Sequence, residues 1–450
     1  MSQTLQLSKS CTQHSISKGE QLVRNLLFYI LLLFPITSLL KTKLAGLNLI
    51  LTGVTVLLFF VYYFFKRFHF RQFFIAIYIV GTFLLNVVKW GFHYYENNML
   101  FYFPFLLLFF ELIKLEKDTF LGTLQSKKRY VDSVLLVWNL AVFISLFLSS
   151  SYIYEGETRG FVSFAGTTFL LCPTAIFVFA ITLVQYQMSG KRIYFCSFII
   201  SSLCILMGSS RTYLAVLLCA WLLFIYISID NKKTFPCIVV LGVFFFILLV
   251  LVSPISEKFL NTANRASVGM DPLEAFTSGR SVFWTYDVIN IFKSKPFDLV
   301  FGHGVNWLFN LNYAYFGNPL WAHNDFIQIL SDYGLFGLSV YLWAFGSLVR
   351  DLLKGLHIPI LPVFFLLFMW LFNAFFNMFY TYFCASLSFP YFCLALRWGG
   401  VALWTWYSEI RLTIKALIGL LKNPTPIQKI IYKLPEWDSS SNFAHLEGVY

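Results

Sequence analysis

Long apolar runs recur along almost the whole of this 450-residue chain, which is 58% hydrophobic, 20% aromatic and only 12% charged. A soluble protein of this size could not hold so many apolar side chains away from water. A bilayer core of about 30 Å requires roughly 20 mostly apolar residues per helix. The sequence therefore predicts an all-α polytopic membrane protein with about twelve spans, near residues 25–40, 44–65, 72–88, 99–113, 131–150, 165–186, 193–209, 212–229, 235–254, 324–349, 358–379 and 383–398.

The basic residues indicate an orientation for these spans. If the N-terminus is cytoplasmic, most of the 33 lysines and arginines fall in cytoplasmic loops, as the positive-inside rule requires. Lys41 and Lys43, in the first outer turn, are the local exception. We therefore expect both termini to be cytoplasmic and the long loop to be extracytoplasmic. The net charge of +12 is explained by topology and does not indicate a nucleic-acid partner.

The predicted spans divide the chain into five parts. The first apolar run follows polar residues and no small-residue cleavage site follows it, so it is interpreted as a retained span and not as a signal peptide. The parts are a cytoplasmic arm at 1–24, nine transmembrane helices at 25–254, an extracytoplasmic catalytic loop at 255–323, three transmembrane helices at 324–398, and a cytoplasmic interfacial helix and tail at 399–450.

The long loop at 255–323 contains no predicted membrane span. Its first part, 257–274, shows no clear periodicity. Apolar residues then recur at helical spacing over 281–291, which predicts an amphipathic helix with Arg280 at its start. A glycine turn at 301–304 precedes an aromatic run. A loop of this length and composition is typical of a functional lid over a cavity.

Three residues on the predicted outer side suit one reaction. Arg211 lies in a tight turn, Arg280 begins the loop helix, and His323 precedes the tenth span. Arginines offer paired donors to a diphosphate, and a histidine can accept a proton from an attacking hydroxyl. Taken singly, Arg211 could instead reach lipid headgroups, and His323 could be an ordinary interface residue.

Other polar and aromatic residues are candidate substrate contacts. Asn324 can cap the tenth span, and Gln328 lies on the same polar side of its first turns. Arg159 belongs to a polar, aromatic loop that could contact sugars or simply connect two spans. The outer carboxylates form no pair that would hold a metal, and no cofactor motif is found, so neither is expected. The full candidate set is Arg159, Arg265, Trp284, His303, Asn324 and Gln328.

A block of motifs resembles the O-antigen ligase and polymerase family of bacterial envelopes. It comprises Thr277-Ser278-Gly279-Arg280, Gly302-His303-Gly304, His323-Asn324-Asp325-Phe326-Ile327-Gln328 and Tyr333-Gly334-Leu335-Phe336-Gly337. The resemblance implies a fold similar to class C glycosyltransferases. It also implies metal-independent, inverting transfer of a glycan from an undecaprenyl-pyrophosphate-linked oligosaccharide. The family's essential residues map onto Arg211, Arg280 and His323.

Within this resemblance, a polymerase of O-antigen or capsular repeat units is favoured, because polymerases serve several polysaccharide pathways. The alternative is a ligase that transfers the glycan to lipid A-core in lipopolysaccharide synthesis. A transporter of lipid-linked sugar is disfavoured, since the spans lack paired halves and mid-span charges. Expected partners besides the substrate are membrane lipids, a chain-length regulator and a flippase.

Overall fold

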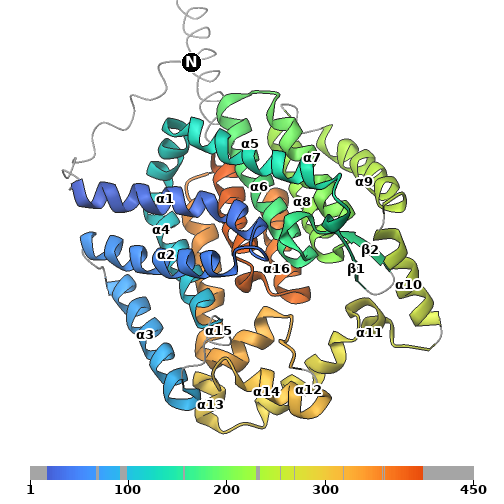
Figure 1. The fold of residues 1–450 in the computed structure, drawn as a ribbon. Helices are drawn as coiled ribbons and strands as arrows, with labels where there is room; N and C mark the ends of the chain where they lie inside the picture. The colour runs from blue at the N-terminus through green and yellow to red at the C-terminus, as the bar shows by residue number, and fades with distance from the viewer. Residues whose placement is uncertain are drawn as a thin grey trace, which may run out of the picture. The chain divides into compact units, whose positions relative to one another are not determined.

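The computed structural model describes residues 18–66, 70–91, 99–155, 158–229, 234–253, 255–267, 269–317, 319–356, 358 and 360–398 (Figure 1). Nearly all of this part of the chain is helical. Its long helices are α1 (Lys18–Leu39), α2 (Ala45–Phe65), α3 (Phe70–Trp90), α4 (Met99–Ser126), α5 (Lys128–Ser145), α6 (Thr168–Ser189), α7 (Tyr194–Met207), α8 (Arg211–Ser228), α9 (Phe235–Leu251), α15 (Asp325–Leu353), α16 (Ile360–Phe376) and a last helix at 383–398.

A helix is found at each of the twelve predicted apolar runs. By length and composition, five of the described helices could each cross a membrane, namely α1, α3, α6, α8 and α15, and α9 with the helix after it would make a sixth, broken span. Helices α2, α7 and α16 contain shorter apolar stretches. The protein is thus a helical, multi-pass membrane protein, as expected, and the count of twelve spans stays a prediction.

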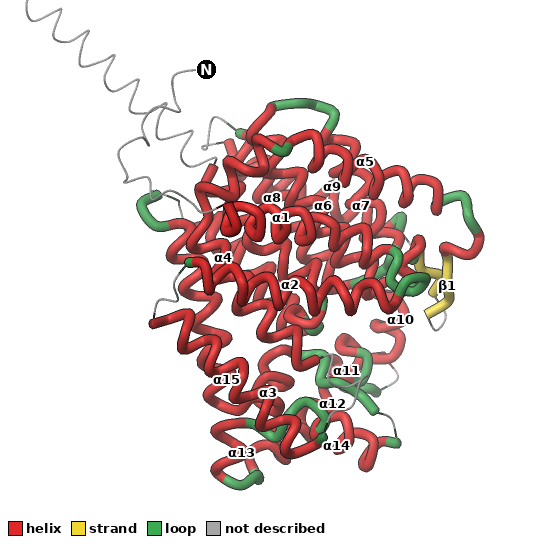
Figure 2. The backbone as a smooth tube through the Cα atoms, turned by 60° about the vertical axis from the view of Figure 1, so that its left-hand side comes forward, coloured by secondary structure: helices red, strands yellow, loops and turns green. Residues whose placement is uncertain are grey.

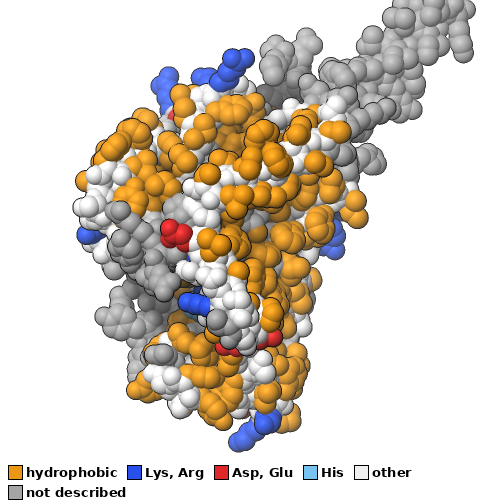
Figure 3. Space-filling view, turned by 90° about the vertical axis from the view of Figure 1, so that its right-hand side faces the viewer, with side chains coloured by type: hydrophobic (Ala, Val, Ile, Leu, Met, Phe, Trp, Pro, Cys, Tyr) orange, Lys and Arg blue, Asp and Glu red, His pale blue; other side chains and the backbone are white. Residues whose placement is uncertain are grey.

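Helix α6 lies in the interior of the bundle. Its side chains are buried along almost its whole length, and it packs against α1, α7 and α8, while α8 also packs along α16. Helices α2, α3 and α9, in contrast, expose large apolar side chains such as Leu57, Val88 and Val240. Figure 3 shows hydrophobic side chains spread over one face, with only scattered charges. Such faces are the ones expected to contact lipid.

The stretch between the predicted spans at 99–113 and 131–150 is mostly helical in the structure. Helix α4 continues through it to Ser126 and bends at Glu116, whose backbone is not helical. The charges are tolerated there because they are paired. Lys66 lies 3.0 Å from Glu116, which also accepts a hydrogen bond from the hydroxyl of Tyr62. Paired charges of this kind can be buried without leaving a charged group unsatisfied.

The connector at 151–166 also has more structure than the sequence indicated. It contains a two-stranded antiparallel hairpin of β1 (Tyr152–Glu155) and β2 (Thr158–Phe161), in which Tyr152 pairs with Phe161 and Glu155 with Thr158. Single 3-10 turns lie on either side of it, at Ser149–Ser151 and Ser163–Ala165. Each strand has only four residues, so the alternation of polar and apolar side chains along it is too short to predict a strand from the sequence.

The segment between α9 and α15 is built from short helices. They are α10 (Ile255–Ser267), α11 (Pro272–Thr277), α12 (Arg280–Phe292), α13 (Pro296–Phe301) and α14 (Trp307–Phe316). Figures 1 and 2 show α11 to α14 gathered together near one end of α15. The predicted loop helix beginning at Arg280 is confirmed. Over 257–274, where the sequence shows no clear periodicity, most residues form α10 and α11.

The glycine turn at 302–304 is bound to α15 through backbone atoms. The amide of His303 donates to the carbonyl of Ser331 (2.7 Å), and that of Gly304 to the carbonyl of Asp332 (3.2 Å). Gly334 has a positive φ of 69° and interrupts the helical geometry of α15 at this contact. A Cβ on Gly334 would lie 2.3 Å from the carbonyl oxygen of Val300. Only glycine allows the two backbones to approach so closely.

Replacing Gly334 by alanine is therefore expected to destabilise the protein by more than about 2 kcal/mol. The matched control is Gly317→Ala. Gly317 also has a φ of 69°, but nothing lies within 4 Å of its added Cβ, so this change carries only a backbone cost of about 1 kcal/mol. Thermal unfolding in detergent would compare the stabilities of Gly334→Ala and Gly317→Ala. Equal losses of stability in the two variants would contradict the close approach of the backbones at Gly334.

Candidate active site

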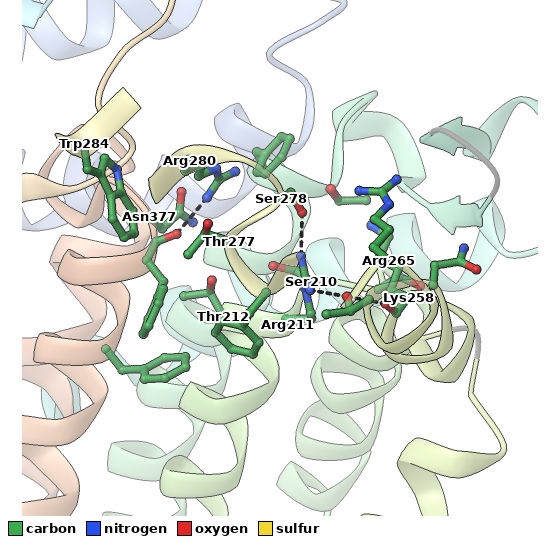
Figure 4. Close-up of a pocket in the computed structure, with 18 residues that line it drawn as sticks. Ser210, Arg211, Thr212, Lys258, Arg265, Thr277, Ser278, Arg280, Trp284 and Asn377 are labelled. Atoms are coloured by element: carbon green, nitrogen blue, oxygen red, sulfur yellow. Dashed lines mark hydrogen bonds between the residues drawn. The ribbon is translucent and has the colours of Figure 1, made fainter. Parts of the chain in front are cut away.

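A cavity of about 530 Å³ opens where the first turns of α6 and α8 meet α10, α11, α12 and the end of α16 (Figure 4). Four basic side chains line it, and no carboxylate is found among its described lining residues. Its basic lining consists of Arg211, Lys258, Arg265 and Arg280. The cavity is therefore suited to an anionic ligand.

Arg211 is held by two hydrogen bonds from its guanidinium group. One nitrogen donates to Thr262 Oγ1 and the other to Ser278 Oγ, each at 2.7 Å. The arginine is the first residue of α8, so it lies beside backbone N–H groups that have no partner inside that helix. These bonds connect α8 to α10 and to the junction between α11 and α12. They fix the side chain in the cavity wall.

Arg280 is positioned by a turn with left-handed backbone geometry. Ser278 and Gly279, at φ 57° and 84°, end α11 and begin α12. The guanidinium of Arg280 then donates to the carbonyl of Phe376 at 2.8 Å, at the C-terminal end of α16. Trp284, one turn further along α12, lines the same cavity. The motif Thr277-Ser278-Gly279-Arg280 thus forms a turn that directs an arginine into the cavity.

His323 lies just before α15, with an unusual positive φ of 49°. The backbone of the preceding residue, Ala322, makes two hydrogen bonds. Trp284 Nε1 donates to the Ala322 carbonyl (2.6 Å), and the Ala322 amide donates to Gln328 Oε1 (3.0 Å). Asn324 Oδ1 caps α15 by accepting from the amide of Ile327 (3.1 Å). These bonds hold the histidine in a strained conformation of the kind common at functional sites.

The side chain of His323 is partly exposed, but its Nδ1 is buried and has no hydrogen-bond partner among the described residues. Burial, with a further contribution from the positive charge of Arg280, lowers the pKa of His323 to about 3. The ring is therefore neutral near pH 7 and able to accept a proton. It lines a second cavity of about 190 Å³, and Phe169 lines both cavities.

The structure brings some of the predicted residues together and separates others. Arg211, Arg265, Arg280 and Trp284 line the larger cavity, and His323 the smaller one. Asn324 and Gln328 were expected to contact substrate. Their side chains are instead buried and bonded within the protein, since Gln328 also donates to Asp332 at 2.9 Å. These bonds connect the turn at His323 to α15, and a substrate contact of Asn324 or Gln328 stays a prediction.

His303 and Arg159 do not join these residues. The imidazole of His303 stacks on Trp307 with 3.8 Å between ring centroids, and its Nε2 lies 2.7 Å from Ser294 Oγ. It lines neither cavity, so a direct substrate contact is not supported. Arg159 is part of β2, but its side chain lies outside the described part of the structure.

Comparison with protein families agrees with this geometry. The model of a family described as O-antigen ligase matches residues 196–342. This matched segment is similar to the O-antigen ligase family over about a third of the chain. No curated protein matches the chain. Members of the family are glycosyltransferase-like enzymes that act on lipid-linked glycans. The O-antigen ligase segment contains Arg211, Arg265, Arg280 and His323, so the resemblance recognised from the sequence motifs is confirmed.

Several residues around the candidate site were missed by sequence reasoning. Lys258, Asn261 and Thr262 line the larger cavity from α10. Their spacing in the sequence, which places them on one side of a helix, could have indicated a shared polar face. Asn377 lines it as well, although it lies outside the family segment, and its Oδ1 is buried without a partner among the described residues. Lys41 lines the cavity of His323. Its predicted position in the first outer turn, where basic residues are rare, could have indicated that it is a candidate site residue.

Proposed function

We propose that this protein is a polysaccharide polymerase, of O-antigen or capsule type. It joins undecaprenyl-pyrophosphate-linked oligosaccharide repeat units by metal-independent, inverting glycosyl transfer on the extracytoplasmic face of the bacterial inner membrane. The observation that carries the proposal is the pair of hydrogen-bonded arginines, Arg211 and Arg280, in one cavity beside a neutral, partly buried histidine. A diphosphate leaving group and a hydroxyl acceptor need those two kinds of residue.

In this mechanism, the pyrophosphate binds between Arg211 and Arg280 in the larger cavity. The acceptor hydroxyl enters beside His323 and attacks the anomeric carbon on the face opposite the pyrophosphate. A bond forms between the acceptor oxygen and that carbon, and the bond from the carbon to the pyrophosphate oxygen breaks. The hydroxyl proton moves to His323, and undecaprenyl pyrophosphate leaves. One displacement of this kind inverts the anomeric configuration.

The low pKa of His323 fits this role once the substrate is bound. Part of the shift comes from the positive charge of Arg280, and a bound pyrophosphate neutralises that charge. The pKa of the histidine then rises, which makes the ring a stronger base, while burial, the larger cause of the low pKa, is unchanged. Before binding, the ring stays neutral, so it is not lost as a base through protonation.

The pH dependence of kcat/KM is expected to reflect this shift. Because the pKa of His323 in the free enzyme is lowered to about 3, the base form is fully present above about pH 5. Between pH 5 and 8, kcat/KM should show no acidic limb from this histidine. Initial rates in a series of buffers at constant ionic strength would test this. An acidic limb near pH 6.5 that disappears in His323→Gln would contradict the burial of the ring.

A ligase is the second candidate, favoured by the match of residues 196–342 to a family described as O-antigen ligase. The deciding experiment is to incubate the purified protein with its undecaprenyl-pyrophosphate repeat unit, with and without lipid A-core, and to separate the glycans on a gel. A ladder formed from the carrier alone supports the polymerase. Product formed only with lipid A-core supports the ligase. Absence of both with folded protein and authentic donor would contradict glycosyl transfer and favour a transporter.

A further inference from the structure

The smaller cavity, which contains His323, has a lysine from the other end of the chain in its wall. Lys41 lies in the turn after α1 and lines this cavity together with Tyr102, Trp321 and Tyr382. Aromatic side chains that combine an apolar ring with a polar end suit a sugar, which also has apolar and polar parts. Lys41 supplies positive charge to the lining, and no carboxylate is found among the described residues of this cavity.

The turn that carries Lys41 is fixed by its neighbours. Thr42 Oγ1 donates a hydrogen bond to the carbonyl of Phe164 at 3.0 Å, in the connector that leads into α6. Gly166, with a φ of 72°, approaches the same threonine so closely that an added Cβ would lie 2.6 Å from Thr42 Cγ2. The backbone that carries Lys41 is therefore held in place by contacts that leave the lysine side chain itself unused.

The positive charge of Lys41 is not compensated within the described part of the protein. Its side chain is partly buried, and it forms no ion pair with a described residue. Burial lowers the pKa of its ammonium group, because the charge loses hydration there. An anionic group on a bound ligand would compensate this loss.

Lys43 shows that this environment is particular to Lys41. It lies two residues further along the same turn, its side chain is exposed, and it lines neither cavity. These two lysines were the local exception to the positive-inside rule in the sequence. Only one of them lines the cavity of the proposed base.

We propose that Lys41 binds an acidic group on the acceptor sugar and thereby holds the acceptor hydroxyl beside His323. This inference rests on the proposed function, in which the acceptor enters the cavity of His323. The acidic group is a sugar carboxylate or a phosphate substituent, both of which accept charge-assisted hydrogen bonds from an ammonium group. Lys41 lies outside the matched residues 196–342, so selection of the acceptor depends on a part of the chain that the family match does not include.

Binding of lipid-free sugars to the full-length protein tests this site. The probes are the methyl glycosides of glucose, glucuronic acid and glucose 6-phosphate, titrated by nuclear magnetic resonance into protein held in phosphatidylcholine nanodiscs. Undecaprenyl pyrophosphate is first added to saturation, so that the larger cavity is occupied. The wild type is compared with Lys41→Gln. The matched control is Lys43→Gln, which removes the same charge from the exposed lysine of the same turn.

The wild type and Lys43→Gln are expected to bind at least one acidic glycoside about tenfold more tightly than methyl glucoside. Lys41→Gln should bind the acidic and neutral glycosides equally, while its affinity for undecaprenyl pyrophosphate stays that of the wild type, which shows that the variant is folded. The preference should persist when phosphatidylglycerol is added to the nanodiscs, because a lipid headgroup does not then occupy the site.

Three results would overturn the proposal. The first is equal binding of acidic and neutral glycosides by the wild type, and the second is a preference that survives in Lys41→Gln or is lost equally in Lys43→Gln. The third is loss of the preference on addition of phosphatidylglycerol, which would mean that Lys41 binds lipid headgroups. Failure of the wild type to bind undecaprenyl pyrophosphate in the first step is a different outcome, and it would contradict the proposed function itself.

Discussion

Replacement of His323 by alanine is expected to lower the rate of glycosyl transfer by about 10²- to 10⁴-fold, the range that general base catalysis contributes. The variant should still bind the donor, because the arginines of the larger cavity are untouched. The fall should therefore appear in kcat and leave the affinity for the donor within a few-fold of the wild type. Single-turnover transfer in detergent and donor binding by the same preparation would measure the two quantities.

His303→Gln is the matched control for this prediction. It changes a second histidine of the same segment, which stacks on Trp307 and lines neither cavity. Transfer by this variant should stay close to the wild-type rate once its folded fraction, measured by gel filtration, is taken into account. Equal rates in His323→Ala and the wild type would exclude His323 as the base.

Arg280→Ala is expected to weaken binding of the lipid pyrophosphate by about 10²-fold or more. Truncating one partner of a buried, hydrogen-bonded charge pair costs about 2–5 kcal/mol. The affinity of Arg280→Lys for the lipid should lie between that of the wild type and that of Arg280→Ala. A lysine keeps the charge but not the paired donors of a guanidinium group. Binding of sugar-free undecaprenyl pyrophosphate at fixed ionic strength is the appropriate measurement, since it separates this step from chemistry.

Arg350→Ala serves as the control for the loss of an arginine. Arg350 lies in the last turn of α15, is 70% exposed and lines neither cavity. Its removal should leave the affinity for the lipid unchanged. If Arg280→Ala also binds normally while remaining folded, the pyrophosphate does not use this arginine, and the orientation of the substrate in the proposed mechanism is wrong.

Local signals in the sequence predicted the helices well. Apolar runs long enough for a membrane span gave the positions of helices from α1 to the last helix at 383–398. The start of α12 at Arg280 and the cap of α15 at Asn324 were also foreseen. These features depend on residues within one or two turns of each other, so the sequence contains the information directly.

The sequence was less informative where charged or polar residues form helices. Helix α4 passes through a stretch rich in charges, and α10 has no continuous apolar run. Both are stabilised by partners from elsewhere in the chain, Lys66 for Glu116 and Arg211 for Thr262. Such partners cannot be identified from local periodicity.

The sequence by itself determined that this is a helical membrane protein, where its helices lie, and which motif block carries Arg280 and His323. Only the tertiary structure decided which polar residues share a cavity. It brought Lys258 and Arg265 of α10 into one cavity with Arg211 of α8 and Asn377, and it bonded Gln328 to the backbone of Ala322. The physical reason is that helix formation is governed by neighbours in sequence, whereas a cavity is formed by packing between segments far apart in it.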